Sequence, residues 1–390
     1  MFQIKIQSTP AHIIAAWRRG HPLFKCLRPL SYLYSHIMQW RRIAYQRQYP
    51  FFKTTTFNVP VIVVGNIQVG GTGKSPMVIW LAKFLKSHGY HPGIISRGYK
   101  SHIKTYPHLV TPTSDPYLYG DEPVMLAEQT DCPVVIDPSR VRGIKWLLSN
   151  ITPIMPITPI TPITPTPDII ISDDGLQHYA LGRTLEIVMH PRFQPMNQDC
   201  LPAGPMREPV SRLREPVSRL KAAAVGCESE PEPEPALFII NSGDVLRAGD
   251  FVLRYQLGPI RPLIRDDGND NGNSVIPLDT FKGKTVHAIC GIARPERFFG
   301  LLRASGIQVI PHSFPDHCVF KQTDIDFGDD YPVLMTEKDA VKCRSFTVVS
   351  GQHFVVGLDI EPDPLFVQDL LAVLASRGFN KKRKENQIHE

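Results

Sequence analysis

A glycine-rich segment that ends in Gly73-Lys74-Ser75 constrains the fold of this 390-residue chain more than any other feature. It follows the apolar run Val61–Val64 and precedes Met77–Ser87, where apolar residues recur at helical spacing. Backbone N–H groups of such a loop and the start of the following helix attract a polyphosphate. A chance glycine-rich turn is the alternative, because the standard motif has glycine where this chain has Gln68.

Different residues of the loop are expected to have different roles. Backbone amides and the lysine are expected to bind nucleotide phosphates, and the Ser75 hydroxyl is expected to reach Mg²⁺. The predicted phosphate-binding residues are Gly70, Gly71, Thr72, Gly73, Lys74 and Ser75.

Short apolar runs alternate with helix-like segments along the rest of the chain. The runs expected to be strands are Gly93–Ser96, Val134–Ile136, Asp168–Ile171, Leu237–Ile240, Thr285–Ile289, Ile307–Ile310 and Val333–Met335. Pro123–Gln129 and Pro295–Ala304 are expected to be helices between them. This alternation predicts an α/β fold with a mainly parallel sheet covered on both faces, and the later runs predict a second, smaller α/β domain.

Composition suggests where the domains meet. We predict a basic amphipathic segment at 1–50, a P-loop core at 51–227, a linker at 228–235 and a smaller C-terminal α/β domain at 236–390. The core carries an insert at 151–167 with proline at about every third position, which predicts an extended polyproline conformation. The linker is acidic and rich in proline, as solvated connections often are.

The first 50 residues contain eight lysines and arginines and no acidic residue, so the rest of the chain is nearly neutral. This distribution argues against a nucleic-acid-binding body, which would need a basic face. Apolar and aromatic residues recur at helical spacing in the same segment: Leu30, Leu33, Tyr34, Ile37, Trp40 and Ala44. The pattern favours an amphipathic helix at a membrane surface, with an ordinary docked helix and a transit peptide as alternatives.

Several other classes are disfavoured. The seven cysteines are scattered and lack C-x-x-C spacing, which speaks against zinc and disulfide frameworks. No run of about 18 apolar residues exists, so no membrane-spanning helix is expected. Without a secretory signal, we expect a reducing, cytosolic compartment.

Two polar clusters and one single histidine are candidates for chemistry. Asp173 and Asp174 follow a predicted strand, where P-loop proteins hold the metal, and Gln177 and His178 lie on the next turn. Asp121 and Glu122 precede a helix, and simple N-capping would explain Asp121. His317 is a lone histidine, which by itself indicates little.

In their order and spacing, these segments resemble the tetraacyldisaccharide 4′-kinases of lipid A biosynthesis. The segments that carry the resemblance are 29–34, 64–76, 96–99, 120–123, 172–178, 201–209, 291–299 and 335–342. Such a loop without its first glycine is shared with that family. The resemblance implies a P-loop α/β core joined to a smaller α/β domain that closes over nucleotide.

The resemblance also implies an activity: ATP-dependent phosphorylation of the 4′-hydroxyl of an acylated glucosamine disaccharide 1-phosphate, which makes lipid IVA. The implied cofactors are ATP and Mg²⁺, and the implied location is peripheral, on the cytoplasmic face of the bacterial inner membrane. Asp121 and His317 are implied to accept the sugar hydroxyl proton, with Lys74 as a further catalytic residue. The implied metal ligands are Ser75, Asp173, Asp174 and Glu122. Gln177 and His178 are implied to bind the nucleotide as well. Tyr99, Arg207 and Glu208 are implied to contact the substrate.

Two questions stay open at this stage. The heptad at 207–213 is repeated at 214–220, so either copy can supply the active-site arginine and glutamate; the first follows Pro-Ala-Gly-Pro directly and is preferred. A membrane-recruited P-loop ATPase or switch is the main functional rival. Its guanine-specific form is disfavoured because Thr336–Asp339 has its lysine displaced from the Asn/Thr-Lys-x-Asp pattern.

Overall fold

The structure is a computed structural model and describes residues 13, 16–17, 20–151, 165–191, 197–214, 236–242, 250–263, 275–346 and 352–379. Most of the proline insert, the linker 228–235 and nearly all of the second heptad copy lie outside these residues. Their conformations therefore stay predictions.

The described strands form one twelve-stranded, mainly parallel sheet with the order β10-β9-β11-β12-β8-β7-β6-β1-β5-β2-β4-β3. In chain order the strands are β1 (Val61–Gly65), β2 (Pro92–Ser96), β3 (His108–Val110), β4 (Val134–Ile136), β5 (Ile169–Asp173), β6 (Leu185–Pro191), β7 (Ala236–Ser242), β8 (Phe251–Pro262), β9 (Thr285–Cys290), β10 (Gln308–Ser313), β11 (Val333–Thr336) and β12 (His353–Pro362). The helices are η1 (Pro22–Leu27), α2 (Arg28–Gln46), α3 (Lys74–Ser87), α4 (Pro116–Tyr119), α5 (Asp121–Thr130), α6 (Arg140–Asn150), η2 (Val210–Arg214), η3 (Leu278–Phe281), α7 (Pro295–Ala304), η4 (Gln322–Asp324), α8 (Glu337–Cys343) and α9 (Pro364–Ser376). The predicted mixed α/β class and mainly parallel sheet are confirmed.

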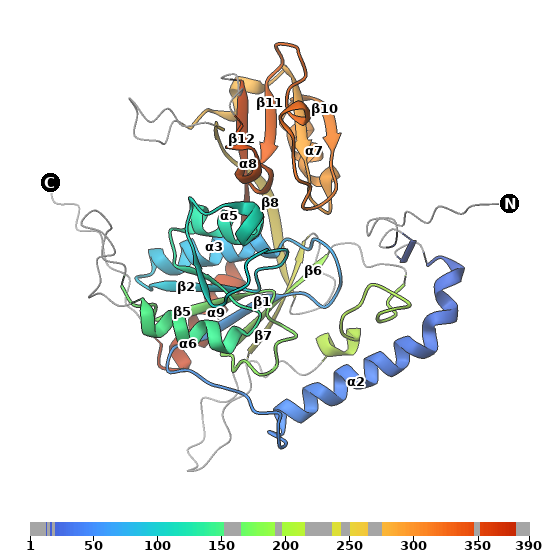
Figure 1. Ribbon diagram of the computed structural model, residues 1–390, viewed down its shortest axis with the longest axis vertical. Coiled ribbons are helices and arrows are strands. Elements are labelled where there is room, and N and C mark those ends of the chain that lie inside the picture. Colours follow the sequence, from blue (N-terminus) through green and yellow to red (C-terminus); the bar gives the residue numbers. More distant parts are fainter. Residues whose placement is uncertain are drawn as a thin grey trace.

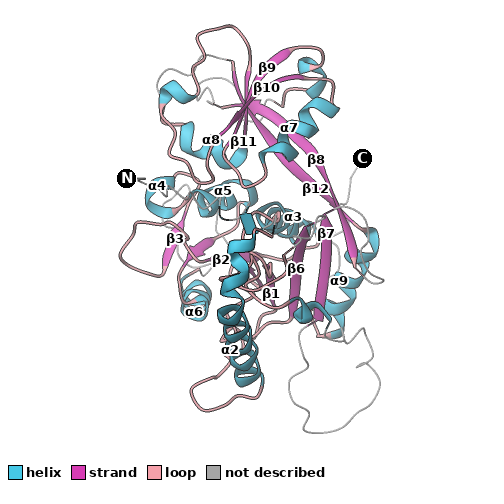
Figure 2. Cartoon of the chain, turned by 90° about the vertical axis from the view of Figure 1, so that its right-hand side faces the viewer, coloured by secondary structure: helices cyan, strands magenta, loops and turns pink. Residues whose placement is uncertain are grey.

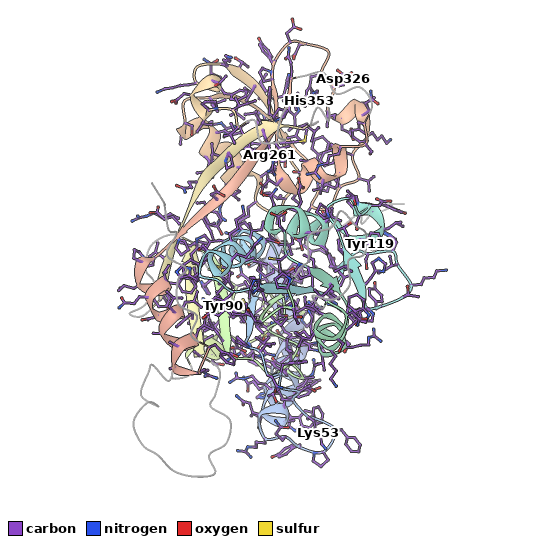
Figure 3. The ribbon with its side chains drawn as sticks, turned by 90° about the vertical axis from the view of Figure 1, so that its left-hand side faces the viewer. Lys53, Tyr90, Tyr119, Arg261, Asp326 and His353 are labelled. Carbon is purple, nitrogen blue, oxygen red and sulfur yellow. The ribbon has the colours of Figure 1, made fainter. Side chains whose placement is uncertain are left out.

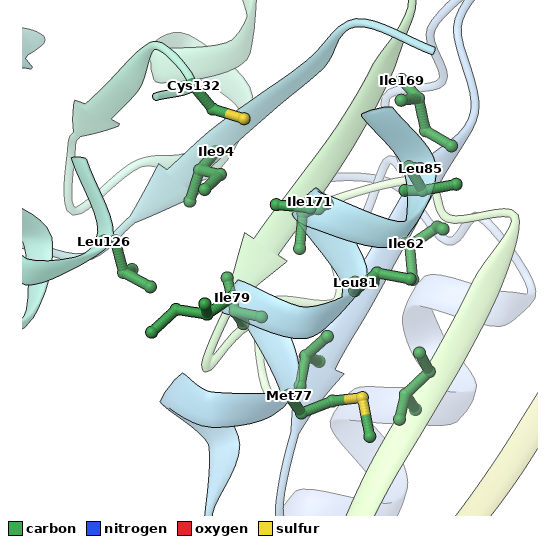
Figure 4. Packing of buried hydrophobic residues seen from close by; sticks show 14 of the residues in the cluster. Ile62, Met77, Ile79, Leu81, Leu85, Ile94, Leu126, Cys132, Ile169 and Ile171 are labelled. Carbon is green, nitrogen blue, oxygen red and sulfur yellow. The ribbon is translucent and has the colours of Figure 1, made fainter. Parts of the chain in front are cut away.

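Strands β1 to β7 and the helices around them form what we call the core lobe, the lower part of Figure 1. Its central strands are buried on both faces because helices cover each side. Met77, Leu81 and Leu85 of α3 pack on Ile62 and Ile171 of the sheet (Figure 4). On the opposite face, α6 covers the sheet with apolar residues of its own.

The end of the chain returns to the core lobe. Strand β7 pairs in parallel with β6, and Phe366 and Leu370 of α9 join the same apolar cluster as Phe238 of β7. The Tyr90 hydroxyl donates to the Phe379 carbonyl, which fixes the segment after α9. The domain boundary expected at 236 therefore does not separate the packing units, because β7 and α9 bury their apolar faces on the core.

Strands β9 to β11, with α7, α8 and the distal ends of β8 and β12, form the small lobe at the top of Figure 2. Its core is built around Phe298, Phe299 and Leu302 of α7. The antiparallel pair β8 and β12 runs through both lobes, so the two lobes share one sheet. Arg261 and His353 mark the small-lobe end of this pair in Figure 3.

Helix α2 lies along the flank of the core lobe, away from the small lobe (Figure 1). The Tyr34 hydroxyl donates to the Arg207 carbonyl at 3.0 Å, and the Ser31 hydroxyl donates to the Cys200 carbonyl. The exposed side holds a row of apolar side chains, each at least half exposed: Leu30, Leu33, Ile37 and Trp40. Among the described helices, none combines the length and apolar content required to cross a bilayer.

Candidate active site

The glycine-rich loop connects β1 to α3 and is held from inside. The buried Asn66 amide donates to the Thr72 hydroxyl at 2.8 Å and to the Gly70 carbonyl at 3.3 Å. Gly70 and Gly73 have φ values of +111° and +87°, a region that side chains with a Cβ rarely adopt. The loop therefore turns sharply, and α3 begins at Lys74.

Gln68, which departs from the standard motif, has a structural role. It is buried and forms an isolated antiparallel bridge with Met206, and the neighbouring Val69 amide donates to the Pro205 carbonyl at 2.8 Å. The first part of the loop thus pairs with the 205–206 segment, an extended conformation that does not require glycine.

Lys74, Asp174 and Arg207 form a charged cluster above the loop. The Lys74 ammonium lies 3.7 Å from an Asp174 oxygen, and Arg207 Nη1 donates to both Asp174 oxygens at 3.0 Å. Burial would raise the pKa of Asp174, but the charges of Lys74 and Arg207 lower it below its usual value. Two cations are therefore held beside the phosphate-binding loop.

Asp173 ends β5 in a buried position. One carboxyl oxygen accepts from the Ser96 hydroxyl at 3.3 Å, while the other has no hydrogen-bond partner among the described residues. Burial, then the charges of Glu122 and Asp174, raise the pKa of Asp173 to about 7. A buried carboxylate oxygen without a donor, close to other acids, fits a bound Mg²⁺, because a hard cation would supply the missing partner.

A cavity of about 150 Å³ lies between the lobes and is lined by the loop, by Ser75 and Glu122, and by small-lobe residues. A Cβ on Gly71 would come within 2.8 Å of the Ala293 Cβ, and one on Gly73 within 1.8 Å of the Tyr255 hydroxyl. We call this space the inter-lobe cavity. The small lobe thus lies directly against the glycine-rich loop.

Asp121 and His317 meet across the lobes. His317 Nδ1 lies 2.8 Å and 2.9 Å from the two Asp121 oxygens, and the Tyr99 ring lies edge-on to the imidazole, 5.5 Å between centroids. Burial would raise the pKa of Asp121, but the hydrogen bond with His317 and the charge of Lys338 lower it to about 2. The N-cap of α5 is Gly120, so capping does not explain Asp121.

Comparison with known proteins identifies the family. The family model described as tetraacyldisaccharide-1-P 4′-kinase matches residues 23–375. The chain belongs to the tetraacyldisaccharide 4′-kinase family. It is therefore an ATP-dependent kinase of lipid A biosynthesis, which excludes the regulatory ATPase alternative.

Individual relatives agree with this assignment. The tetraacyldisaccharide 4′-kinase of Nitrosococcus oceani is 39% identical over 95% of this chain and 96% of its own length. That of Coxiella burnetii is 39% identical over 93% and 94%. A solved structure, described as the "apo" form of LpxK from Aquifex aeolicus in complex with ATP, matches with a TM-score of 0.68 and 25% identity, covering 92% of this chain and 100% of that one.

The remaining candidate residues named from the sequence lie near the loop. Gln177 donates to the Glu208 carboxylate at 2.7 Å and to the Asn66 carbonyl at 3.2 Å. Glu208 is buried and also faces Arg212 at 3.5 Å, so it supports the loop from below. Burial and the charge of Arg140 lower the pKa of His178 to about 4. Arg207 and Glu208 are from the first heptad copy; the second lies almost wholly outside the described residues.

Among the residues that line the inter-lobe cavity, Tyr255, Asp316 and Lys338 were not sequence candidates. Lys338 lies inside the 335–342 segment that carried the family resemblance, and Asp316 directly precedes the candidate His317, so both positions were visible although their contacts were not. Tyr255 belongs to β8, which the sequence did not predict as a strand, and its neighbours carry no motif. Its proximity to Gly73 comes only from the folded arrangement.

Proposed function

We propose that the chain transfers the γ-phosphoryl group of ATP to the 4′-hydroxyl of a tetraacyldisaccharide 1-phosphate, making lipid IVA. The P-loop core lobe would bind the nucleotide, and the small lobe would act as a second α/β domain that supplies His317. The observation that carries this proposal is the Asp121–His317 hydrogen bond, made across the lobes beside a phosphate-binding loop.

The pair is suited to accept a proton. Asp121 occupies Nδ1, so the lone pair of His317 Nε2 can take the proton from the sugar hydroxyl as the oxygen attacks phosphorus. The ionised carboxylate then stabilises the imidazolium and holds the ring in place. Tyr99, which is about half exposed beside the imidazole, is placed to contact the sugar.

The core lobe supplies the charge that phosphoryl transfer requires. Lys74 and Arg207, which contact Asp174 in this structure, would also contact the phosphates of a bound nucleotide. Ser75, Asp173, Asp174 and Glu122 would hold Mg²⁺. Bound magnesium would neutralise charge on the phosphates. Gln177 and Glu208 would keep the loop in shape, and His178, which is largely neutral near pH 7, would contribute no charge.

We infer further that α2 lies on a membrane surface, which would place the kinase peripherally on the cytoplasmic face of the inner membrane. The row Leu30, Leu33, Ile37 and Trp40 faces away from the protein, as an interfacial helix requires. Because Tyr34 donates to the Arg207 carbonyl, a lipid held along α2 would lie close to the charged cluster.

An acceptor assay tests the reaction. Labelled ATP is incubated with tetraacyldisaccharide 1-phosphate and with soluble sugars, and only the lipid disaccharide should gain label. Asp121→Asn should lower kcat about 10³-fold with unchanged nucleotide affinity, because only proton acceptance is lost. Wild-type turnover in the folded variant would show that Asp121 is not part of the base.

A vesicle assay tests the membrane proposal. Leu33→Ser/Trp40→Ser should weaken partitioning to anionic vesicles at least tenfold, because each exposed apolar side chain contributes roughly 1.5–3 kcal/mol when buried. Leu365→Ser removes a similarly exposed leucine on α9 and should have no effect. Equal partitioning of both variants and the wild type would show that α2 does not bind the membrane and is an ordinary docked helix.

A further inference from the structure

Lys338 occupies a position that the proposed function does not use. It lies in the first turn of α8, and its side chain is 12% exposed. Its ammonium contacts a Glu122 oxygen at 3.0 Å and an Asp316 oxygen at 2.9 Å, and it lies 3.4 Å from His317 Nε2. The two carboxylates hold the ammonium in place, and the longer 3.4 Å contact engages the Nε2 lone pair only weakly, as the proposed proton acceptor requires.

These contacts cross the lobe boundary. Helix α5 presents Asp121, Glu122 and Glu128 to the small lobe, where they meet His317, Lys338 and Arg344 respectively. Lys338 differs from Arg344 because it also binds Asp316, the residue directly before the proposed base. A charge on Lys338 therefore acts on the 316–317 segment, whereas a charge on Arg344 joins the lobes elsewhere.

The backbone at His317 makes such support necessary. Its φ is +61°, in the left-handed region that is unfavourable for residues with a side chain. Residues held in such conformations persist when neighbouring contacts over-determine them, and these residues cluster at active sites. Here the Asp121 carboxylate contacts His317 Nδ1. The Lys338 ammonium contacts the Asp316 carboxylate and lies near His317 Nε2.

Resting on the proposed function, we propose that Lys338 is a positioning residue for phosphoryl transfer: by joining Glu122 of the core lobe to Asp316 of the small lobe, it fixes His317 against Asp121. Without the ammonium, the Glu122 and Asp316 carboxylates would lie near each other without a counter-charge. Their repulsion would move the 316–317 segment away from α5 and lengthen the Asp121–His317 hydrogen bond.

The charge state of Lys338 agrees with this role. Burial would lower its pKa, but the carboxylates of Glu122, Asp121 and Asp316 raise it above the usual value. The side chain therefore stays an ammonium throughout the physiological range. Three acids around one buried cation also mean that a neutral replacement leaves a local excess of negative charge.

Kinetics of matched variants test the proposal. Lys338→Met keeps the length of the side chain and removes the charge; kcat should fall at least 30-fold, with the KM for ATP changed less than threefold. Lys338→Arg should recover most of the lost kcat. Arg344→Met breaks the ion pair between Arg344 and Glu128 of α5 and should lower kcat no more than about threefold.

A spectroscopic measurement separates positioning from general stability. The Nδ1 proton of the Asp121–His317 hydrogen bond should give a low-field proton resonance in the wild type and in Arg344→Met. This resonance should be shifted or lost in Lys338→Met. If Lys338→Met does not fold, Lys338→Met/Asp316→Asn removes the Glu122–Asp316 repulsion together with the ammonium, so the resonance and kcat should return toward their wild-type values. A low kcat and a lost resonance in this double variant would show that the repulsion is not the cause.

The outcomes distinguish this inference from the proposed function. If Asp121→Asn loses activity while folded Lys338→Met keeps wild-type kcat and an unshifted resonance, Lys338 has no positioning role and the catalytic pair stands. If Asp121→Asn keeps full activity, the proposed function fails first. An equal kcat loss in Lys338→Met and Arg344→Met would also overturn the proposal, because simple lobe docking would then explain both.

Discussion

The two halves of the proposed kinase site are built differently. The phosphate half, with Lys74, Asp174 and Arg207, comes wholly from the core lobe. The proton-transfer half joins residues from both lobes: Asp121 meets His317, 196 positions later, and Glu122 meets Lys338, 216 positions later. The first half is present whenever the core lobe is folded, whereas the second exists only while the small lobe is docked on α5.

The largest effect is expected from the phosphate half. Lys74→Ala removes the cation nearest the loop and should weaken nucleotide binding about 30-fold and lower kcat/KM roughly 10³-fold. Calorimetric titration with ATP and a turnover assay measure the two losses. Asp121→Asn is the matched contrast, because it should reduce turnover and leave the calorimetric affinity unchanged.

Either of two results would break the comparison between the halves. Full nucleotide affinity in Lys74→Ala would mean that the loop is not the phosphate site. A loss of affinity in Asp121→Asn as large as in Lys74→Ala would mean that both halves form together, so that the core lobe is not preorganised by itself.

The phosphate half was largely predictable from sequence. Its strand, loop and helix are contiguous, and the apolar run before the loop and the glycines within it have local causes. Most expected strands formed within two residues of their predicted bounds, for example β4 at Val134–Ile136, whereas β10 extends three residues beyond its expected end, to Ser313. Strand β8 was missed because Phe251–Pro262 has no regular alternation of burial and is shaped by its long pairing with β12.

The smallest effect is expected from Asp173→Asn, and it concerns stability. The pKa of Asp173 is raised from 3.8 to about 7 by burial and neighbouring acids. Between these values the native protein keeps a proton that the unfolded chain releases, so stability falls as pH rises from about 4 to 7. Asparagine cannot ionise, so the stability of the variant should fall less than that of the wild type between pH 5 and pH 8.

Urea unfolding at pH 5 and pH 8, without nucleotide or metal, measures this difference. Asp279→Asn, which changes an exposed carboxyl of the small lobe, should keep the pH dependence of the wild type. If Asp173→Asn also keeps it, the Asp173 carboxyl is already ionised in the native protein. The Asp173 oxygen that has no hydrogen-bond partner among the described residues would then have one in the native protein.

The proton-transfer half was only partly predictable. Local sequence gave N-capping as the simplest explanation for Asp121 and gave no role to His317; only resemblance to the family paired them. Their contact depends on how the small lobe docks, which no local pattern encodes. The same holds for Lys338, whose three contacts come from both lobes, and for Glu208, which the family suggested near substrate and which lies buried beneath the loop.

The continuous ribbon of β8 and β12 limits how the lobes can move. A flexible linker would let the two lobes move apart freely. Here any rotation of one lobe must twist a hydrogen-bonded pair of strands, which resists twisting. The pairing register shifts between Val356 and Leu358, where Gly357 lies against Gly258. Neither glycine has a side chain, so the two strands approach closely at this irregularity. A rotation of the small lobe away from α5 would have to distort this strand pair, so the pairing favours the docked arrangement in which His317 meets Asp121.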